Sequence, residues 1–306
     1  LRWVLAHVQP EDQELERLRR EELAAGSVIA NIHRILLPVR VRPTADPVHE
    51  IEAFIVRELS RRSAISVTLL NIPEGRARQS GMEYLEWLQQ YFQSADLTRK
   101  VVSSQDPEQA ILNEAIKDYD LLILGATQRR RDDHSLFHPL VDRLVRMAPC
   151  PTLVVKGAVG SSRWPPRRLL VPTNGSAAAR RAAELAFALM PADRGEVVVL
   201  NVVQLPDVQY ELADLPARFD REWSTAQSVV TELAEMGHAH GARVIPEVVE
   251  GRGAEEVILE FTRKQDIDLI ILGTDVRPGT ARLFLGPRVE RVLANAPCPV
   301  LILNAT

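Results

Sequence analysis

A chain of 306 residues is long enough for two domains of ordinary size. Apolar residues make up 46% and charged residues 25%, as in globular proteins, and no apolar stretch approaches the roughly 20 residues that span a bilayer. The net charge of −4 gives no electrostatic basis for nucleic-acid binding, and two cysteines, Cys150 and Cys298, exclude a disulfide framework.

The first 32 residues differ in character from the rest. Residues 1–8 are mostly apolar and include Trp3, which fits either the end of a membrane segment or the start of a short amphipathic helix. Residues 10–26 carry opposite charges three and four positions apart, which predicts a solvated helix. Since the chain begins with Leu1 and not Met, we expect residues 1–32 to connect the domains to a preceding part of a longer protein. The alternative is an ordinary N-terminal helix.

Residues 33–156 alternate strand and helix patterns. Short apolar strands are predicted at residues 35–39, 65–71, 98–102, 121–124 and 152–155. Strands that are apolar on both faces are typical of a parallel sheet covered by helices, so this segment predicts an α/β domain. Residues 157–167 are rich in Gly, Ser and Pro and are interpreted as a linker.

Residues 168–306 repeat this order. Strands are predicted at 168–173, 196–203, 243–249, 268–272 and 300–303, and helices at 177–190, 217–238, 254–264 and 288–295. The segment that begins at Asp118 matches the one at Asp266, and the segment at Ala148 matches the one at Ala296, both at an offset of 148 residues. A constant offset indicates duplication of one folding unit. We therefore expect two doubly wound domains, each with its own five-stranded parallel sheet and helices on both faces, and not one continuous sheet.

The second unit resembles the universal stress protein family over its whole length. That family has a five-stranded parallel sheet, and many members bind ATP or related adenine nucleotides. Its nucleotide signature has Gly, two residues, Gly, nine residues, and Gly followed by Ser or Thr. Gly273 and Gly286 keep the first and third glycine positions, whereas Val276 and Pro287 replace the second glycine and the Ser or Thr. Asn174 stands where the family has an Asp after the first strand.

These departures predict a weaker grip on phosphate than in strong ATP binders. Val276 disfavours positive φ, and Pro287 supplies neither a hydroxyl nor an N–H group. Arg277 and Arg288 flank the loop, where they either pair with a phosphate or are ordinary surface arginines. The implied ligand is ATP, AMP or another adenine nucleotide, with no metal. The candidate binding residues are Pro172, Thr173, Asn174, Val203, Gly251, Gly273, Thr274, Arg277, Gly286, Pro287 and Arg288.

The first unit departs further from the family signature. Gly125 keeps the first glycine position, but Gln128, His138 and Pro139 replace the later signature residues, and Arg40 stands in place of the Asp. We therefore expect no ATP site of the family type in this unit.

A charged connector followed by two degenerate domains also resembles the C-terminal cytosolic region of bacterial cation:proton (Na⁺/H⁺) antiporters. This resemblance implies a regulatory module at the cytoplasmic face of the inner or plasma membrane, with the transmembrane antiporter domain N-terminal to this fragment. The alternative is a free cytoplasmic universal stress protein that binds ATP or AMP. In the family the last strands pair two domains, so we expect residues 152–155 and 300–303 to join the two units or to form a homodimer.

Catalysis finds no support in the sequence. No Ser-His-Asp grouping or Walker-type loop can be placed by motif, and a slow nucleotide hydrolase would need a general base that we cannot name. Cys150 and Cys298 each lie between two prolines before an apolar strand, which indicates a packing role. We expect a binding protein and not an enzyme.

Overall fold

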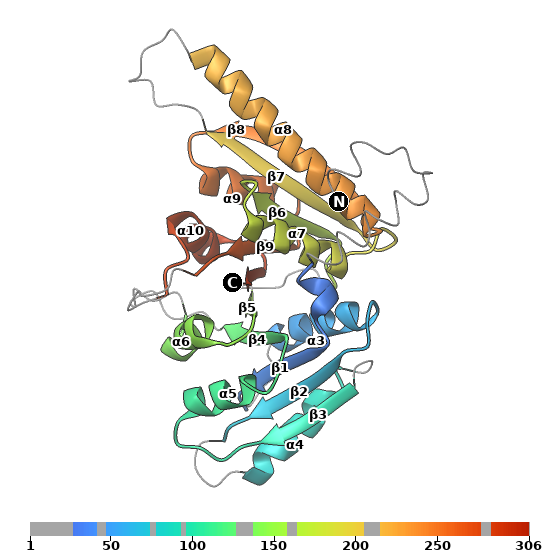
Figure 1. Cartoon of the computed structure of the whole chain (residues 1–306), viewed down its shortest axis with the longest axis vertical. Helices are drawn as coiled ribbons and strands as arrows, with labels where there is room; N and C mark the ends of the chain where they lie inside the picture. The colour runs from blue at the N-terminus through green and yellow to red at the C-terminus, as the bar shows by residue number, and fades with distance from the viewer. Residues whose placement is uncertain are drawn as a thin grey trace, which may run out of the picture.

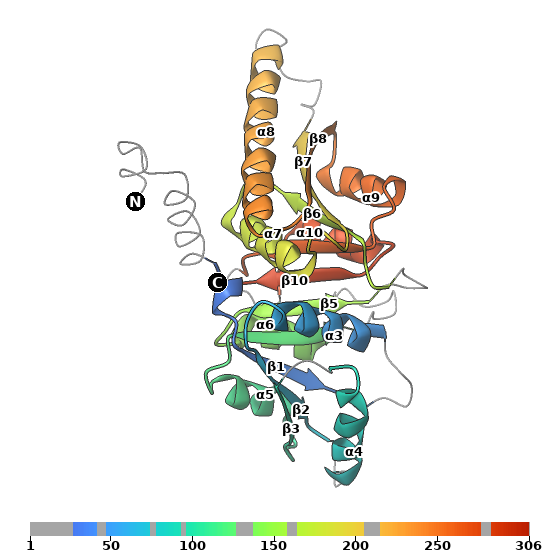
Figure 2. The same ribbon diagram turned by 90° about the vertical axis from the view of Figure 1, so that its right-hand side faces the viewer.

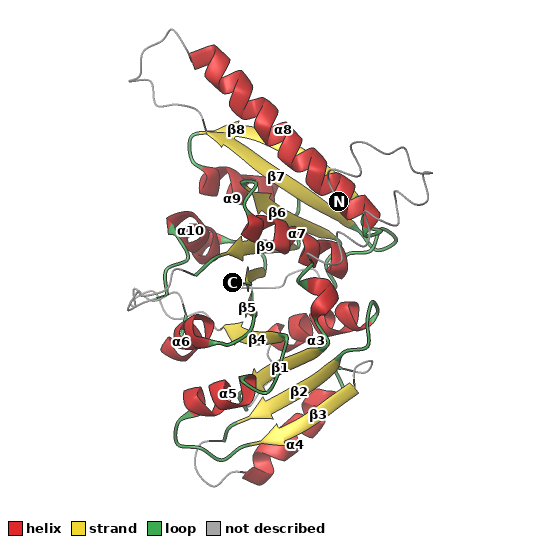
Figure 3. Cartoon of the chain, in the orientation of Figure 1, coloured by secondary structure: helices red, strands yellow, loops and turns green. Residues whose placement is uncertain are grey.

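The computed structural model describes residues 27–41, 47–73, 78–92, 96–126, 137–157, 164–204, 215–276 and 283–305. The predicted connector helix at residues 10–26 lies outside this part of the chain. Two halves alternate strands with helices, one coloured blue to green and the other yellow to red in Figure 1. Figure 3 distinguishes the helices from the strands in the same view.

The first half begins with a short 3-10 turn, η1 (Ile29–Asn31). Its strands are β1 (Arg34–Val39), β2 (Ser66–Asn71), β3 (Asp96–Val101), β4 (Leu121–Ala126) and β5 (Thr152–Lys156). Its helices are α3 (Pro47–Ser60), α4 (Arg78–Gln89), α5 (Pro107–Ala115) and α6 (Pro139–Met147).

The second half has the same order of elements. Its strands are β6 (Arg168–Thr173), β7 (Glu196–Gln204), β8 (Val244–Gly251), β9 (Leu269–Thr274) and β10 (Val300–Asn304). Its helices are α7 (Ala177–Leu189), α8 (Leu215–Ala239), α9 (Ala254–Lys264) and α10 (Pro287–Asn295).

The strands form one sheet in the order β3-β2-β1-β4-β5-β10-β9-β6-β7-β8. Helices α3, α4, α7 and α8 bury their apolar side chains on one face, and α5, α6, α9 and α10 bury theirs on the other. In Figure 2, α8 and α9 lie on opposite sides of the second half of the sheet, and α4 and α5 lie on opposite sides of the first half. The prediction of an α/β fold with a mostly parallel sheet and helices on both faces is confirmed.

The prediction of two separate five-stranded sheets is wrong. Strands β5 and β10 pair antiparallel, from Val300 opposite Lys156 to Asn304 opposite Thr152, and join the two parallel halves into a ten-stranded sheet. All five residues of each strand are buried. Without this pairing, each half would end on an apolar edge strand with unpaired N–H and C=O groups. The backbone groups of β5 and β10 instead pair with each other. These strands therefore present no open edge for pairing with a second chain.

A repeated Asp-x-Asp segment ties the fourth strand of each half to the first. Asp118 and Asp266 adopt φ angles of 58° and 49°, a left-handed conformation that turns the chain from the preceding helix towards the strand. Two residues later, Asp120 accepts hydrogen bonds of 2.8 Å from the backbone N–H groups of the two residues at the start of β1. Asp268 accepts the equivalent bonds, 2.8 and 3.0 Å long, at the start of β6.

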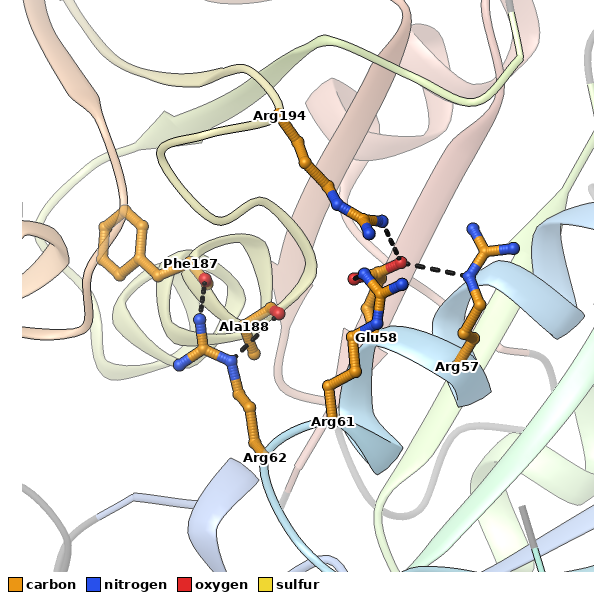
Figure 4. A network of polar contacts seen from close by, with 7 residues as sticks. All are labelled: Arg57, Glu58, Arg61, Arg62, Phe187, Ala188 and Arg194. Atoms are coloured by element: carbon orange, nitrogen blue, oxygen red, sulfur yellow. Dashed lines mark hydrogen bonds and ion pairs between the residues drawn. The ribbon is translucent and has the colours of Figure 1, made fainter. Parts of the chain in front are cut away.

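A polar network joins helix α3 of the first half to the second half (Figure 4). The Glu58 carboxylate is 1% exposed and pairs with Arg57 (3.2 Å) and Arg61 (2.8 Å) from its own half and with Arg194 (2.9 Å) from the turn after α7. Arg62 donates hydrogen bonds to backbone carbonyls at the C-terminal end of α7, 2.7 and 3.2 Å long. These cations satisfy both the buried carboxylate and the helix end.

We predict that Glu58→Ala lowers the free energy of unfolding by about 2 kcal/mol, because it leaves three cations around an uncharged site. The loss stays below that of a fully buried pair because the three arginine side chains are 38–45% exposed and can be rehydrated. Urea unfolding measures it. As a control, Glu232→Ala removes a carboxylate that is 62% exposed in its pair with Arg180 and should change stability by less than about 0.5 kcal/mol. Equal effects of the two substitutions would contradict the role of Glu58.

Candidate functional site

Each half has a switch point, between β1 and β4 in the first and between β6 and β9 in the second, where neighbouring strands lead to helices on opposite faces. Ligands of doubly wound folds bind in the crevice outside the carboxyl ends of the strands at such points. The two switch points lie on either side of the central β5–β10 pair, and the strands of both halves point their carboxyl ends to the same side in Figure 1. The molecule therefore has two candidate sites, one in each half.

The candidate residues of the second half meet at one edge. They come from the carboxyl ends of β6, β7, β8 and β9 and from the start of α10. Arg277 lies outside the described residues. The structure brings together Pro172, Thr173, Asn174, Val203, Gly251, Gly273, Thr274, Gly286, Pro287 and Arg288.

A polar bridge spans this edge. Arg288 at the start of α10 donates a hydrogen bond of 2.8 Å to the side-chain oxygen of Gln204, the last residue of β7. The amide nitrogen of Gln204 in turn donates to the backbone carbonyl of Arg252, after β8, at 3.5 Å. These hydrogen bonds therefore link the start of α10 to the carboxyl ends of β7 and β8. Sequence reasoning identified Arg288 but missed Gln204, because a partner from a distant strand leaves no local signal.

Gly286 leaves the start of helix α10 open. Its φ of 93° and ψ of 146° are accessible in practice only to glycine, and it supplies no side-chain cap. A Cβ atom placed there would meet nothing within 4 Å. At the equivalent position of the first half, His138 has an ordinary φ of −60°, and its ring nitrogen Nδ1 accepts a 3.3 Å hydrogen bond from the backbone N–H of Leu140. The first half thus closes its helix start with an imidazole.

Val276 stands where the family has its second glycine, and its backbone N–H already has a partner. It donates to the side-chain oxygen of Asn304, the last residue of β10, at 3.2 Å. At the end of β6, the side-chain oxygens of Thr173 and Asn174 accept backbone hydrogen bonds of 3.1 Å within the turn that leads to α7. The edge therefore holds its polar groups in fixed positions but offers few free backbone donors.

Helix packing explains why residue 273 is a glycine. A Cβ atom there would lie 1.9 Å from the backbone oxygen of Ala178, so glycine is needed for α7 to pack on β9. At Gly125 in the first half, the nearest atom to an added Cβ would be a side-chain oxygen of Glu52, at 2.8 Å. The first glycine of the signature therefore serves helix packing in this fold, whatever it does for a ligand.

The first half holds a cavity of about 320 Å³ at its switch point. The sequence did not predict this cavity, because its lining comes from elements that are distant in the chain. Side chains from β1, β2, β4, α3, α5 and α6 line it. Its apolar lining consists of Val39, Val48, Leu70, Ile72, Ile111, Leu124, Leu140, Val141 and Leu144. Its charged and titratable lining consists of Arg40, His49, Glu52 and His138.

Two of these polar residues form a buried pair on α3. The Nδ1 atom of His49 lies 2.8 Å from a carboxylate oxygen of Glu52, and its Nε2 atom lies 3.0 Å from the hydroxyl of Tyr84 on α4. His49 is 6% exposed and Glu52 is 1% exposed. A signal for this pair was present in the sequence, since positions three apart on a helix are neighbours.

Comparison with known proteins decides the family. A model described as the universal stress protein family matches residues 31–156 and, a second time, residues 166–304. The chain belongs to the universal stress protein family. Universal stress protein MJ0531 of Methanocaldococcus jannaschii is 31% identical over 144 residues, which cover 45% of this chain and 82% of that protein. Universal stress protein E of Photorhabdus laumondii is 26% identical over 264 residues, 78% of this chain and 80% of that protein.

A solved structure supports the fold over nearly the whole length. A universal stress protein from Archaeoglobus fulgidus superposes with a TM-score of 0.56 at 17% identity and covers 89% of this chain and 98% of its own. The tandem pair of universal stress domains is therefore established for this chain. None of the helices in the described ranges is long and apolar enough to cross a bilayer. Within the same ranges, His, Cys, Asp and Glu side chains form no cluster of three or more that would ligate a metal ion.

The cysteines of the two stress domains are packing residues, as their sequence context predicted. Cys298 is buried among apolar side chains, and Cys150 is partly buried against the same core. Burial raises the pKa of the Cys150 thiol to about 11 and that of Cys298 to about 12. Neither thiol ionises near neutral pH, so neither has the character of a nucleophile.

We predict that Gly273→Ala lowers the free energy of unfolding by about 3 kcal/mol, because the new methyl group collides with the backbone of α7. Gly125→Ala should cost at least about 1 kcal/mol less, since its closest neighbour is the end of a side chain that can move. Thermal and urea unfolding of both variants, without nucleotide, give the comparison. If Gly273→Ala is the milder change, the packing explanation for this glycine is wrong.

Proposed function

We propose that this chain is a nucleotide-binding universal stress protein, and that AMP, ATP or a related adenine nucleotide binds at the carboxyl edge of its second domain. The observation that supports this most is the start of α10, where Gly286 leaves the helix N-terminus without a side-chain cap. A helix N-terminus favours a phosphate through its free N–H groups and its dipole. The corresponding helix start in the first domain is closed by His138.

The surrounding residues suit the phosphate end of such a ligand. Gln204 holds the Arg288 guanidinium beside the start of α10, and a guanidinium binds phosphate oxygens with charge-assisted hydrogen bonds. Asn174, at the end of β6, offers amide groups to a sugar hydroxyl or a base edge. Pro287 has no N–H, and the N–H of Val276 is occupied by Asn304. With so few donors for a triphosphate, we expect AMP to bind at least as tightly as ATP.

The regulatory module of an antiporter is the weaker alternative. It depends on a connector in residues 1–32, of which residues 1–26 lie outside the described residues, and on a membrane domain for which the comparisons give no support. The similar proteins reported above are universal stress proteins, and a tandem pair of such domains accounts for the chain from residue 31 to residue 304. We also infer that the protein binds its nucleotide without hydrolysing it, because the carboxylate of Glu290, beside the start of α10, already accepts a hydrogen bond of 3.4 Å from the backbone N–H of Leu285.

The test compares Gly286→Asp with Gly286→Asn by calorimetry with AMP and ATP. Both side chains strain the backbone at a φ of 93° to the same extent, but only Asp places a negative charge at the helix start. We predict that Asp weakens AMP binding by about tenfold or more relative to Asn.

His138→Asp in the first domain is the matched control and should leave AMP binding unchanged. If Asp and Asn at position 286 bind AMP equally, or if His138→Asp has the larger effect, the nucleotide does not bind where we propose. Absence of AMP and ATP binding to the unmodified protein would overturn the proposed function itself.

A further inference from the structure

We propose that the cavity of the first domain is a second ligand site, and that it takes a small amphipathic carboxylate whose apolar body lies inside and whose anionic head lies at Arg40. This inference concerns the other domain, and it does not depend on nucleotide binding at α10.

The interior of the cavity favours an apolar body. Its walls come from the ends of three strands and from three helices, with Val39, Leu70, Leu124, Val141 and Leu144 among the lining side chains. All five are at most 8% exposed, so the cavity penetrates the core on that face of the sheet. A volume of about 320 Å³ lies at the lower end of the range for small-molecule sites. Filling it would remove apolar surface from water at about 25 cal/mol per Å².

The buried polar groups of the wall already have partners. Glu52 is paired with His49 at 2.8 Å, and His49 contacts Tyr84 at 3.0 Å. The pair joins α3 to α4. Because the imidazole of His49 already lies against the Glu52 carboxylate, that carboxylate does not require a cationic group from the ligand. A ligand body without charge is therefore compatible with the interior.

The corresponding helix start of the first domain, at α6, is not open to a phosphate. The imidazole of His138 accepts the hydrogen bond of the Leu140 N–H at the start of α6, which in the second domain is left open beside Gly286. A nucleotide bound here would lack the helix-start contact on which our proposal for the second domain depends. The two domains are thus differentiated by the residue at one helix cap.

The mouth of the cavity carries the positive charge. Arg40 follows the last residue of β1 and is exposed, at the position where Asn174 stands in the second domain. The N-terminal residues Pro107 of α5 and His138, the cap of α6, also line the cavity, so the positive ends of two helix dipoles point towards it. A carboxylate at the mouth would pair with the Arg40 guanidinium, which matches carboxylate geometry.

The probes are octanoate and octylammonium, which have the same chain and opposite head charges. We expect saturable 1:1 binding of octanoate by calorimetry and at least tenfold weaker binding of octylammonium. Arg40→Gln should weaken octanoate binding by about tenfold. Val141→Phe should abolish it by filling the cavity, with circular dichroism as the check on folding. Asn174→Ala, at the equivalent position of the second domain, is the control and should leave octanoate binding unchanged.

Three results would overturn the inference: no octanoate binding, equal binding of the two probes, or octanoate binding that survives Arg40→Gln. If Val141→Phe does not fold, Arg40→Gln alone decides, since Arg40 is exposed. Competition of AMP with octanoate would make the cavity a nucleotide site and also contradict us. Gly286→Asp should leave octanoate binding intact, so failure here and failure of the proposed nucleotide site can be told apart.

Discussion

The antiparallel pairing of β5 with β10 is the interaction on which the arrangement of this molecule depends. Each domain alone would end its parallel sheet on a fully buried, apolar strand, and such an edge is stable only when another strand or a covering element satisfies it. Because this chain contains two copies of the unit, the edge strand of each copy pairs with that of the other. The pairing also brings α3 against α7, where buried Glu58 and its arginines join the two domains on one face.

The same pairing gives each domain its own candidate site. The two switch points, between β1 and β4 and between β6 and β9, lie on either side of the β5–β10 pair. The duplicated sites have also diverged in chemistry. One has a helix start at Gly286 with no side-chain cap, and Arg288 in its first turn is hydrogen-bonded to Gln204. The other has a helix start capped by His138 and an apolar cavity with Arg40 at its mouth. Duplication has thus left one scaffold with two binding edges of different character.

Much of this structure was predictable from local patterns. The alternation of apolar strands and amphipathic helices predicted the α/β fold, and the constant offset of the Asp-x-Asp segments predicted the duplication. The structure explains why the second aspartate of each segment is repeated: Asp120 and Asp268 accept the backbone hydrogen bonds that fix the first strand of each domain. Gly286 was identified through the family signature, and its φ of 93° explains why a glycine stands there.

The other features depend on contacts between distant parts of the chain. Residues 152–155 and 300–303 were expected to join the two units or to form a homodimer, but nothing in either strand specifies which of the two occurs, or that the pairing makes one continuous sheet. Gly273 was interpreted through a ligand, whereas the carbonyl of Ala178 on the neighbouring helix accounts for it. The cavity of the first domain depends on six elements that leave a space between them, and apolar residues at strand ends look the same whether or not they enclose one.

Native-state hydrogen exchange of the backbone amides tests the continuous sheet most directly. Strands β3 and β8 lie at the outer edges of the sheet, where one side of each strand has no partner strand, whereas β5 and β10 lie at its centre. The account predicts that amides of β5 and β10 exchange as slowly as those of β1 and β6, through opening of the whole sheet. It would be contradicted if β5 and β10 exchanged as fast as β3 and β8, because that is the behaviour of two separate sheets with open edges.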